Sequence, residues 1–257
     1  MKSERAPALS LVLLKEILME SFFINLWNRF DKSFLEQDRW KMYFEGLGNT
    51  LLIALIATVI GTTIGVIFAM IKYINKRTGK LKILNKIANV YITVIRGTPV
   101  VLQLMILYFI VFSGWDNGIL IGAITFGLNS GAYVAEIARA GFESVDDGQM
   151  EAGRSLGMST WQTMYHIIIP QAIRNCLPPL FNEFITLVKE TAIVGYVGIM
   201  DLGKIPGLIQ SRTFDYLFPL LIAALLYLAV VMVLTKILHI IEKRFSKSDR
   251  RNGGIKN

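Results

Sequence analysis

The sequence predicts an all-α membrane protein with five transmembrane helices and a helical cytoplasmic segment between the third and fourth spans. Of its 257 residues, 53% are hydrophobic and only 18% are charged. The mean hydropathy is +0.50. A soluble domain of this length carries more charge and shorter apolar runs. The basic residues behind the net charge of +8 cluster beside apolar runs, a placement that favours membrane topology over nucleic-acid binding.

The first 45 residues differ from the rest of the chain. Residues 1–45 contain seven basic and seven acidic residues. Apolar residues recur there at helical spacing, at Leu11, Leu14, Leu18 and Phe22. We expect an interfacial, amphipathic helix rather than a span. The membrane domain is then expected over 46–245, followed by a basic cytoplasmic tail over 246–257.

Five apolar stretches are long enough to cross a bilayer, which requires about 20 residues each. They cover residues 51–71, 87–112, 117–135, 178–200 and 216–235. The second stretch is interrupted by Arg96-Gly97-Thr98-Pro99. Within the spans, Gly61 and Gly65 are four residues apart, as are Gly127 and Gly131. Such spacing lets helices approach closely in lipid, and we expect packing within one subunit rather than a dimer seam.

The basic residues predict the orientation in the membrane. One cluster follows the first span, at Lys72, Lys76, Arg77, Lys80, Lys82 and Lys86. A second follows the fifth span, at Lys236, Lys243, Arg244, Lys247, Arg250, Arg251 and Lys256. Lysine and arginine favour the cytoplasmic side, which places the first loop, the loop over 141–177 and the C-terminus inside. The N-terminus is then expected outside, although its seven basic residues run against this rule.

The long third loop, over residues 141–177, is predicted to form two short helices joined by a hinge. Asp146-Asp147 places negative charge at the start of the first helix, where the helix dipole is positive. Gly157 suits the left-handed conformation that ends a helix. Ser159 and Gln162 have the spacing of a capping box on the second helix. These two helices and their hinge, within residues 146–170, form a rigid elbow. A connector that only joined two spans would not require one.

The same loop resembles the coupling motif of ABC importer permeases. That motif is Glu-Ala-Ala, three residues, Gly, nine residues, then Ile-x-Leu-Pro. Matching residues stand here at Glu151, Ala152, Gly157, Ile167 and Pro170. Gly153 replaces the second alanine and Ile169 replaces the leucine. In that family the first helix of the loop docks in a groove of the ATPase subunit, and the resemblance implies this role for Gly148, Gln149, Glu151, Ala152, Gly153 and Gly157.

Other segments resemble the polar amino-acid permeases of the same family. The similar motifs are Arg96-Gly97-Thr98-Pro99 with Gln103, then Gly131-Ala132-Tyr133 with Glu136 and Arg139, then Asn182, Phe184 and Lys189-Glu190-Thr191. Ala192 stands where that family usually has serine. The similarity covers roughly 46–245. It implies a dimer of permease subunits, either homodimer or heterodimer, with two ATP-binding subunits that hold ATP and Mg²⁺, and an extracytoplasmic substrate-binding protein.

Polar and charged residues within the spans have two interpretations. They are expected to face the bundle interior or water, because ionisable groups are costly in hydrocarbon. Candidates for a substrate path are Thr98, Gln103, Asn129, Glu183 and Lys189. The alternative is that they bridge helices or reach the interface. For Arg96 and Lys189 we favour this structural role, whereas for Glu183 the two interpretations are balanced.

Prolines mark expected helix breaks and limits. Pro99 lies inside the second span and Pro170 is expected to limit the second loop helix. Pro178 and Pro179 fit either a helix that bends during transport or an ordinary helix start, and we favour the start.

No catalytic or metal-binding motif was found in the sequence. A phosphate-binding Gly-x-x-x-x-Gly-Lys-Ser/Thr motif is absent, so ATP hydrolysis is expected on another chain and no cofactor is expected on this one. The sequence is therefore not expected to be an enzyme by itself. Rival functions are an ABC permease for another small solute, and a passive channel or structural membrane subunit. The elbow argues against the second rival, because a channel needs no ATPase-docking helix.

Overall fold

A computed structural model describes residues 5–252, with side chains described for residues 16–243. Every regular element in this part of the chain is helical. The helices are α1 (Arg5–Phe34), α2 (Arg39–Thr78), α3 (Lys82–Gly97), α4 (Val100–Ile106), α5 (Gly118–Glu143), α6 (Asp147–Ser155), α7 (Thr160–Thr163), α8 (Ile169–Glu190), α9 (Ile205–Thr213) and α10 (Leu217–Asn252). Tighter or wider helical turns lie at Glu36–Asp38, Leu107–Val111, Met164–Ile168 and Thr191–Val197.

Three described helices are long and apolar enough to cross a membrane. They cover Glu36–Thr78, Gly118–Glu143 and Leu217–Lys243. A fourth candidate span consists of α3 and the helical segment Val100–Val111, which includes α4. The two parts are bent by 105° at the predicted break. The described chain is therefore an all-helical membrane protein with three to four candidate spans. α8 is not among them, and it contains Glu183, Lys189 and Glu190.

The centre of the bundle is the contact between α2 and α5. Glycines allow it, since a Cβ at Gly65 would lie only 2.5 Å from the Val134 side chain. A Cβ at Gly127 would lie 2.7 Å from that of Ile60. Side chains normally keep helix axes 8–10 Å apart, and small residues bring them closer. The expectation that these glycines pack helices within one subunit is confirmed.

The N-terminal part joins the bundle through one corner. α2 begins at Arg39 and is continuous through residue 45, and its Tyr43 is fully buried against Leu202 and Ile205. Arg29 of α1 donates two hydrogen bonds, of 2.9 and 2.8 Å, to the carboxylate of Asp215 before α10. The hydrogen bonds from the Arg29 guanidinium lower the pKa of Asp215. This pair anchors the C-terminal end of α1.

Two proline predictions are wrong. Pro178 and Pro179 lie inside α8, which has already begun at Ile169, so neither starts a helix. Pro170 does not end the second loop helix, because α7 continues through the wide turn Met164–Ile168 into α8. In a regular α-helix the ring of Pro170 would clash with the carbonyl four residues earlier. That carbonyl lies in a π-helical turn, which is wider than an α-helical one. Proline in the first turn of α8 then loses no intrahelical bond.

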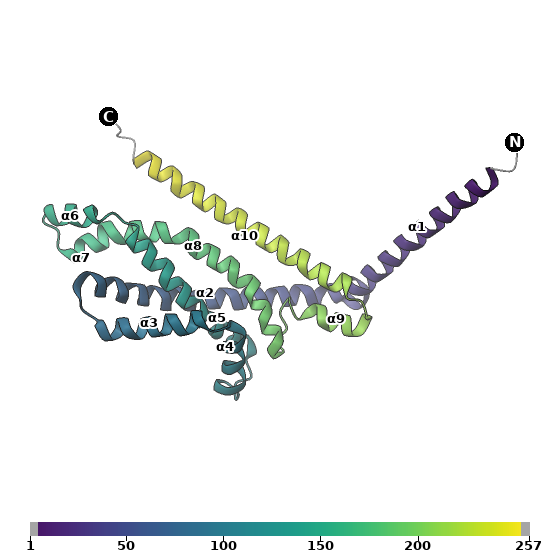
Figure 1. The fold of residues 1–257 in the computed structure, drawn as a ribbon, viewed down its shortest axis with the longest axis horizontal. Helices are drawn as coiled ribbons and strands as arrows, with labels where there is room; N and C mark the ends of the chain where they lie inside the picture. Colours follow the sequence, from purple (N-terminus) through teal and green to yellow (C-terminus); the bar gives the residue numbers. More distant parts are fainter. Residues whose placement is uncertain (1–4, 253–257) are drawn as a thin grey trace.

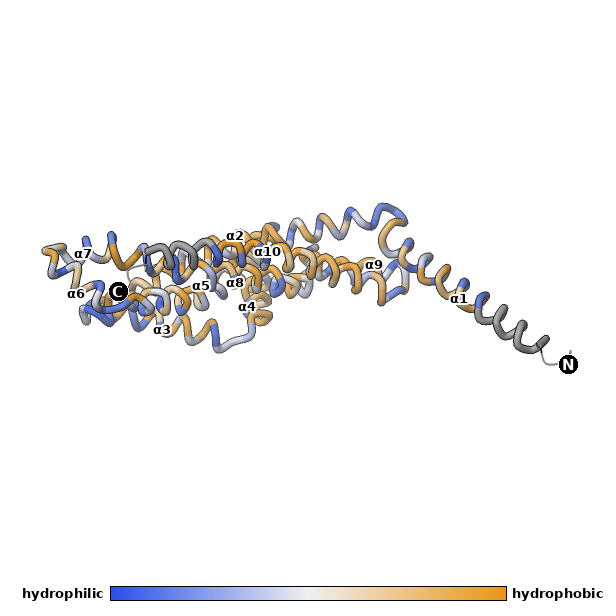
Figure 2. Tube along the Cα trace, turned by 90° about the horizontal axis from the view of Figure 1, so that it is seen from above, coloured by the Kyte–Doolittle hydropathy of each residue, from blue (hydrophilic) through white to orange (hydrophobic). Residues whose placement is uncertain are grey.

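The ends of the molecule differ in chemistry. In Figure 1, α6, α7, the turn between α2 and α3, and the C-terminal end of α10 all lie at one end, while α9 and the start of α2 lie at the other. Figure 2 shows hydrophobic residues along the middle of the bundle and hydrophilic ones around α6 and the α2–α3 turn. The basic cluster after the first span and the described part of the cluster on α10 therefore share one end with the elbow.

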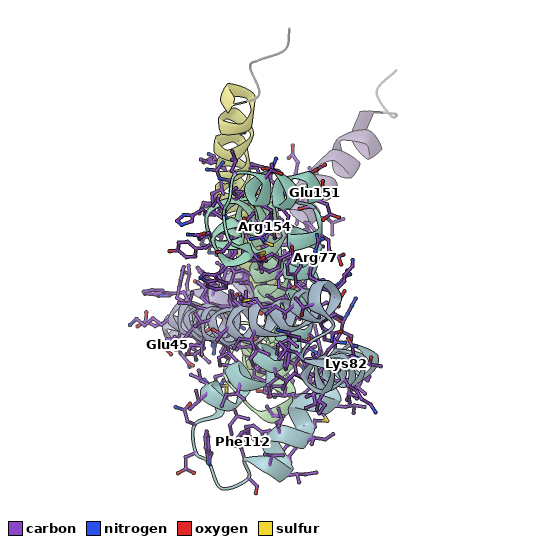
Figure 3. The ribbon with its side chains drawn as sticks, turned by 90° about the vertical axis from the view of Figure 1, so that its left-hand side faces the viewer. Glu45, Arg77, Lys82, Phe112, Glu151 and Arg154 are labelled. Atoms are coloured by element: carbon purple, nitrogen blue, oxygen red, sulfur yellow. The ribbon has the colours of Figure 1, made fainter. Side chains whose placement is uncertain are left out.

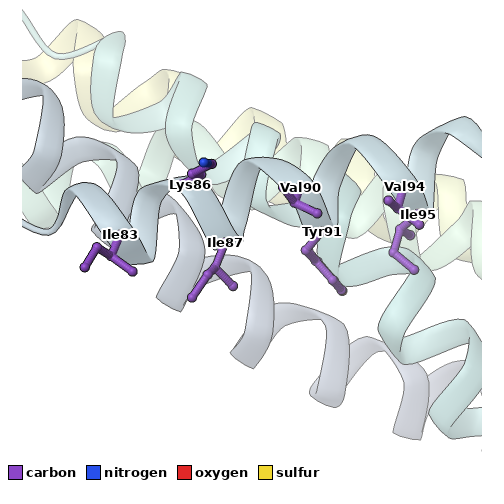
Figure 4. A pocket seen from close by; sticks show the side chains of 7 residues that line it. All are labelled: Ile83, Lys86, Ile87, Val90, Tyr91, Val94 and Ile95. Carbon is purple, nitrogen blue, oxygen red and sulfur yellow. The ribbon is translucent and has the colours of Figure 1, made fainter.

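The outer face of α3 is apolar and exposed. It lines a shallow pocket of about 490 Å³ formed by residues of α3 alone, and Figure 4 shows these side chains. Ile83 is 78% exposed and Val90 is 56% exposed. Exposed aliphatic surface on this scale is typical of a helix that meets lipid or another subunit.

Candidate functional site

The elbow has the local geometry that its sequence predicts. The Asp146 carboxylate accepts a 2.7 Å hydrogen bond from the Gly148 amide at the start of α6. Gly157 follows α6 with φ of +82°, in the left-handed region. Ser159 and Gln162 form both bonds of the capping box at α7. The Gly148 and Gln162 amides, which have no partner within their own helices, thus gain one from a residue nearby.

The outer face of α6 is open to solvent. Gly148, Gln149, Glu151, Ala152 and Gly157 are exposed in the described chain, whereas Gly153 is buried. A Cβ at Gly153 would lie 2.5 Å from Thr163 Cγ2, so this glycine lets α6 lie directly on α7. The predicted coupling residues therefore divide into an exposed face and one packing position.

Two large apolar residues on the elbow were missed by the sequence analysis. Leu156 is 81% exposed and Trp161 is 66% exposed. Large apolar side chains this open on a charged surface are characteristic of contact sites. Their position on either side of the Gly157 hinge was the available signal. Leu156 extends the exposed face of α6 around the hinge, whereas Trp161 lines a groove between α2 and the elbow.

Ion pairs join α2 to α5 directly before the elbow. Lys72 on α2 donates a 2.9 Å hydrogen bond to Glu136 on α5. Arg139 binds the other oxygen of Glu136 at 2.8 Å. One turn further along α2, Lys76 binds Glu143 at 2.7 Å. These pairs join α2 to the last turns of α5, directly before α6.

Arg77 extends this chain of ion pairs to the elbow itself. Its guanidinium binds the Asp147 carboxylate at the start of α6. Figure 3 looks at the molecule from this end and shows Arg77 of α2 below Glu151 and Arg154 of α6. The ion pair therefore links the start of α6 to the last turn of α2. In the sequence, these basic residues indicated only the membrane topology.

A second polar cluster surrounds the break between α3 and α4. The Gln103 side-chain amide donates to the Thr98 hydroxyl at 2.8 Å and to the Ile95 carbonyl at 2.9 Å. The Asn129 amide on α5 donates a 3.0 Å bond to the Gln103 side-chain oxygen. Because Pro99 has no amide hydrogen, carbonyls in the preceding turn lose their helical donors and need others at membrane depth. The Gln103 side chain donates to one of them, the Ile95 carbonyl. Three of the five predicted path residues thus form one network.

The other two predicted path residues are placed differently. Glu183 on α8 accepts a 2.9 Å hydrogen bond from Ser130, the neighbour of Asn129 on α5. Lys189 is exposed and takes part in none of the described hydrogen bonds or ion pairs with the other four residues. Arg96 lies over the Tyr133 ring at 5.1 Å, an interaction that bridges helices. Among the described residues, no cluster of histidine, cysteine and carboxylate residues is arranged to hold a metal ion.

Comparison with known proteins identifies the family. Residues 61–247 match the family described as "Binding-protein-dependent transport system inner membrane component". The chain is 42% identical over 203 residues to the "Putative glutamine transport system permease protein GlnP" of Rickettsia typhi, covering 78% of this chain and 91% of the relative. It is 38% identical over 208 residues to the "Arginine transport system permease protein ArtQ" of Bacillus subtilis, covering 80% and 93%.

A solved structure supports the same assignment. The structure described as "Crystal structure of an amino acid ABC transporter with histidines" matches with a TM-score of 0.75 and 40% identity, covering 82% of this chain and 98% of that one. In this family the ATPase activity resides on partner subunits. The chain therefore belongs to the binding-protein-dependent transport system inner membrane components, as a multi-pass permease subunit of an ABC importer within the amino-acid group of that family.

Proposed function

We propose that this permease subunit carries a polar amino acid through a path beside the α3–α4 break, and that α6 couples the path to ATPase subunits. The observation that carries the proposal is the exposed α6, which the Arg77–Asp147 ion pair joins to the end of α2. Close to that end, the ion pairs of Lys72 and Lys76 join α2 to α5. Charge pairs that link packed helices transmit displacement because the helices behave as rigid elements. An exposed docking face would otherwise move independently of the spans.

The membrane arrangement is proposed from the same frame. We assign five spans, to α2, the bent α3–α4 pair, α5, α8 and α10, with α6 as the coupling helix between the third and fourth. The basic ends of α2 and α10 lie at the elbow end, which supports a cytoplasmic C-terminus and an outside N-terminus. Residues 1–45 then form an interfacial segment, 46–245 the permease domain and 246–257 a basic tail.

The complete transporter is proposed to contain several chains. Two ATP-binding subunits hold ATP and Mg²⁺ and dock on the coupling helices through Gly148, Gln149, Glu151, Ala152 and Gly157. A second permease subunit, identical or homologous, completes the path, and an extracytoplasmic binding protein delivers the solute. ATP binding closes the ATPase pair, moves α6 and opens the path outward, and hydrolysis resets it. The chain itself binds membrane lipid but no cofactor and no nucleic acid.

The relatives support an amino acid as the solute. The Rickettsia relative is named for glutamine transport and the Bacillus relative for arginine transport. Thr98, Gln103 and Asn129 supply hydroxyl and amide groups suited to a zwitterion, and Glu183 adds a carboxyl group behind Ser130. Lys189 lines the path only if α8 turns toward the α3–α4 break during transport. An ABC permease for another small solute is the remaining alternative.

The test combines assembly with uptake. The chain is expressed with its ATPase subunits, and co-purification and uptake of labelled amino acids are measured for the wild type and for Glu151→Lys. We expect the variant to lose most co-purification and uptake, because it reverses charge on the exposed face of α6. Glu45→Lys, an exposed glutamate outside the elbow (Figure 3), is the control and should retain both.

Two results would contradict the proposal. If no ATPase subunit binds the wild-type chain and solute still crosses, the chain acts as a passive channel. If the chain supports ATP-dependent uptake of another small solute but of no amino acid, the coupling role stands and the proposed solute class is wrong. Screening the binding protein against labelled amino acids identifies the cargo independently.

A further inference from the structure

A groove lies beside the elbow, apart from the proposed substrate path. It encloses about 550 Å³ between the end of α2, the last turn of α5 and the α6–α7 elbow. Its wall is apolar and aromatic, with two arginines and no acidic residue. The lining includes Met70, Ile74 and Arg77 of α2, Arg154 of α6 and Trp161 of α7. This volume is within the range of small-ligand sites, about 300–1,000 Å³.

The groove continues the outward apolar stripe of α2. Leu55, Val59 and Ile67 are 56%, 61% and 52% exposed on the face away from α5. Ile74 follows Ile67 by seven residues, which returns it to the same helix face, and it lines the groove. In a membrane-spanning helix such a stripe faces acyl chains. A lipid lying along α2 would therefore reach the groove with its headgroup end.

The two arginines stand where that headgroup would lie. Arg77 is on the last turn of α2 and Arg154 is on α6. Each guanidinium has five donors. The ion pair with Asp147 uses Nη2 of Arg77, and the bond to the Met158 carbonyl uses Nη1 of Arg154. Planar guanidinium groups at the cytoplasmic surface suit a phosphate.

We propose that this groove binds one anionic phospholipid, with its phosphate at Arg77 and Arg154 and an acyl chain on Met70 and Ile74. The bound lipid would contact both α2 and the elbow, and would hold the elbow against the span. Coupling between ATPase and path then depends on the anionic lipid content of the membrane. This inference rests on the proposed orientation, in which the elbow end is cytoplasmic.

Trp161 in the groove wall provides the probe. Trp27, Trp40 and Trp115 are replaced by phenylalanine in the full chain, so that Trp161 is the remaining tryptophan. The chain is reconstituted in phosphatidylcholine vesicles that contain increasing fractions of brominated phosphatidylglycerol or brominated phosphatidylcholine of the same acyl length. We expect brominated phosphatidylglycerol to quench Trp161 at a lower mole fraction than brominated phosphatidylcholine.

Variants test the arginines. Arg77→Gln or Arg154→Gln should raise the phosphatidylglycerol fraction needed for half-quenching about fivefold, since one basic side chain near the surface contributes about 1 kcal/mol to anionic lipid binding. Lys82→Gln, a basic residue at the same end but outside the groove (Figure 3), should leave it unchanged. If an arginine variant fails to fold, the comparison of the two lipids in the parent chain still decides.

Equal quenching by the two lipids would overturn the proposal, because the groove would then not select the anion. Absence of quenching by either would also overturn it, and would indicate that a protein partner or water fills the groove. Co-purification of the ATPase subunits is measured separately on the same chain. A chain that binds its ATPase but shows no lipid selectivity contradicts only the lipid site, whereas loss of co-purification in the wild type contradicts the proposed function.

Discussion

Lys72 on α2 and Glu136 on α5 form an ion pair of 2.9 Å at the base of the elbow, with side chains 18% and 25% exposed. Glu136 also binds Arg139, one turn along its own helix. One carboxylate thus holds two cations in a partly buried position, where screening by solvent and salt is reduced. The more buried of the two described ion pairs between α2 and α5 therefore lies close to the segment that is proposed to receive the ATPase.

Neutralising this pair should weaken the contact between α2 and α5 close to the elbow. We expect Glu136→Gln to destabilise the protein more than Lys72→Gln, because it leaves two cations without their shared partner. A double-mutant cycle should give an interaction energy of about 0.5–3 kcal/mol, measured by thermal unfolding in detergent. The exposed pair Lys41 and Asp38 is the control, for which about 0–1 kcal/mol is expected. An interaction energy no larger than that of the control would contradict the bracing role.

The Gln103–Asn129 bond should matter for both stability and transport. Gln103→Leu leaves Asn129, which is 4% exposed, without its described partner. An unsatisfied buried amide costs about 1–3 kcal/mol, so the free energy of unfolding should fall by that amount. Gln171→Leu, which loses only a bond within its own helical segment, should cost less. Adding Asn129→Leu to Gln103→Leu should cost less than the sum of the single changes.

Transport separates the proposed path role from a purely structural one. Gln103→Leu should lower amino-acid uptake while the ATPase subunits still co-purify, since the elbow is unchanged. Uptake that stays at the wild-type level, with stability reduced, would mean that Gln103 serves only to seal the helix break.

The effect of substituting Gly153 should be compensated by a second substitution at Thr163. Gly153→Ala introduces a Cβ that would lie 2.5 Å from Thr163 Cγ2, and overpacking of this kind costs about 1–3 kcal/mol. Thr163→Ala removes the colliding atoms, so the double variant should regain most of the ATPase co-purification lost by Gly153→Ala. Gly207→Ala on α9, where nothing lies within 4 Å of the new Cβ, is the control. Failure of Thr163→Ala to restore assembly would show that Gly153 acts by direct contact with the partner.

The contact between α1 and the α9–α10 corner should depend on pH. Arg29 lowers the pKa of Asp215 from its ordinary value of 3.8, so the pair contributes its full stabilisation above that value. The contribution is lost as the pH falls through the lowered pKa. Spin labels at Ser21 and Leu221 should therefore move apart only in strong acid. In Asp215→Asn the distance should already be long at neutral pH and independent of acidification; an unchanged, short distance would contradict the anchor.

The local parts of the fold follow from the sequence. The Asp146 cap, the Gly157 hinge and the Ser159–Gln162 capping box each depend on residues no more than a few positions apart, so their hydrogen bonds are visible as spacing. The break at Pro99 is predictable for the same reason, because proline lacks the amide hydrogen that a helix requires. The prediction at Pro170 failed because a wide turn precedes it. Those at Pro178 and Pro179 failed because both prolines lie inside a helix that begins at Ile169.

The class of the chain, the apolar stretches and the elbow can be predicted from the sequence, because hydropathy and helix caps depend on neighbouring residues. Which polar groups meet depends on the tertiary structure. Gln103 and Asn129 are 26 residues apart, Ser130 and Glu183 are 53 apart, and Lys72 and Glu136 are 64 apart. These pairings depend on how closely the glycines let α2 approach α5 and on where the bent α3–α4 pair lies against it. Packing geometry, rather than spacing along the chain, brings the polar side chains together.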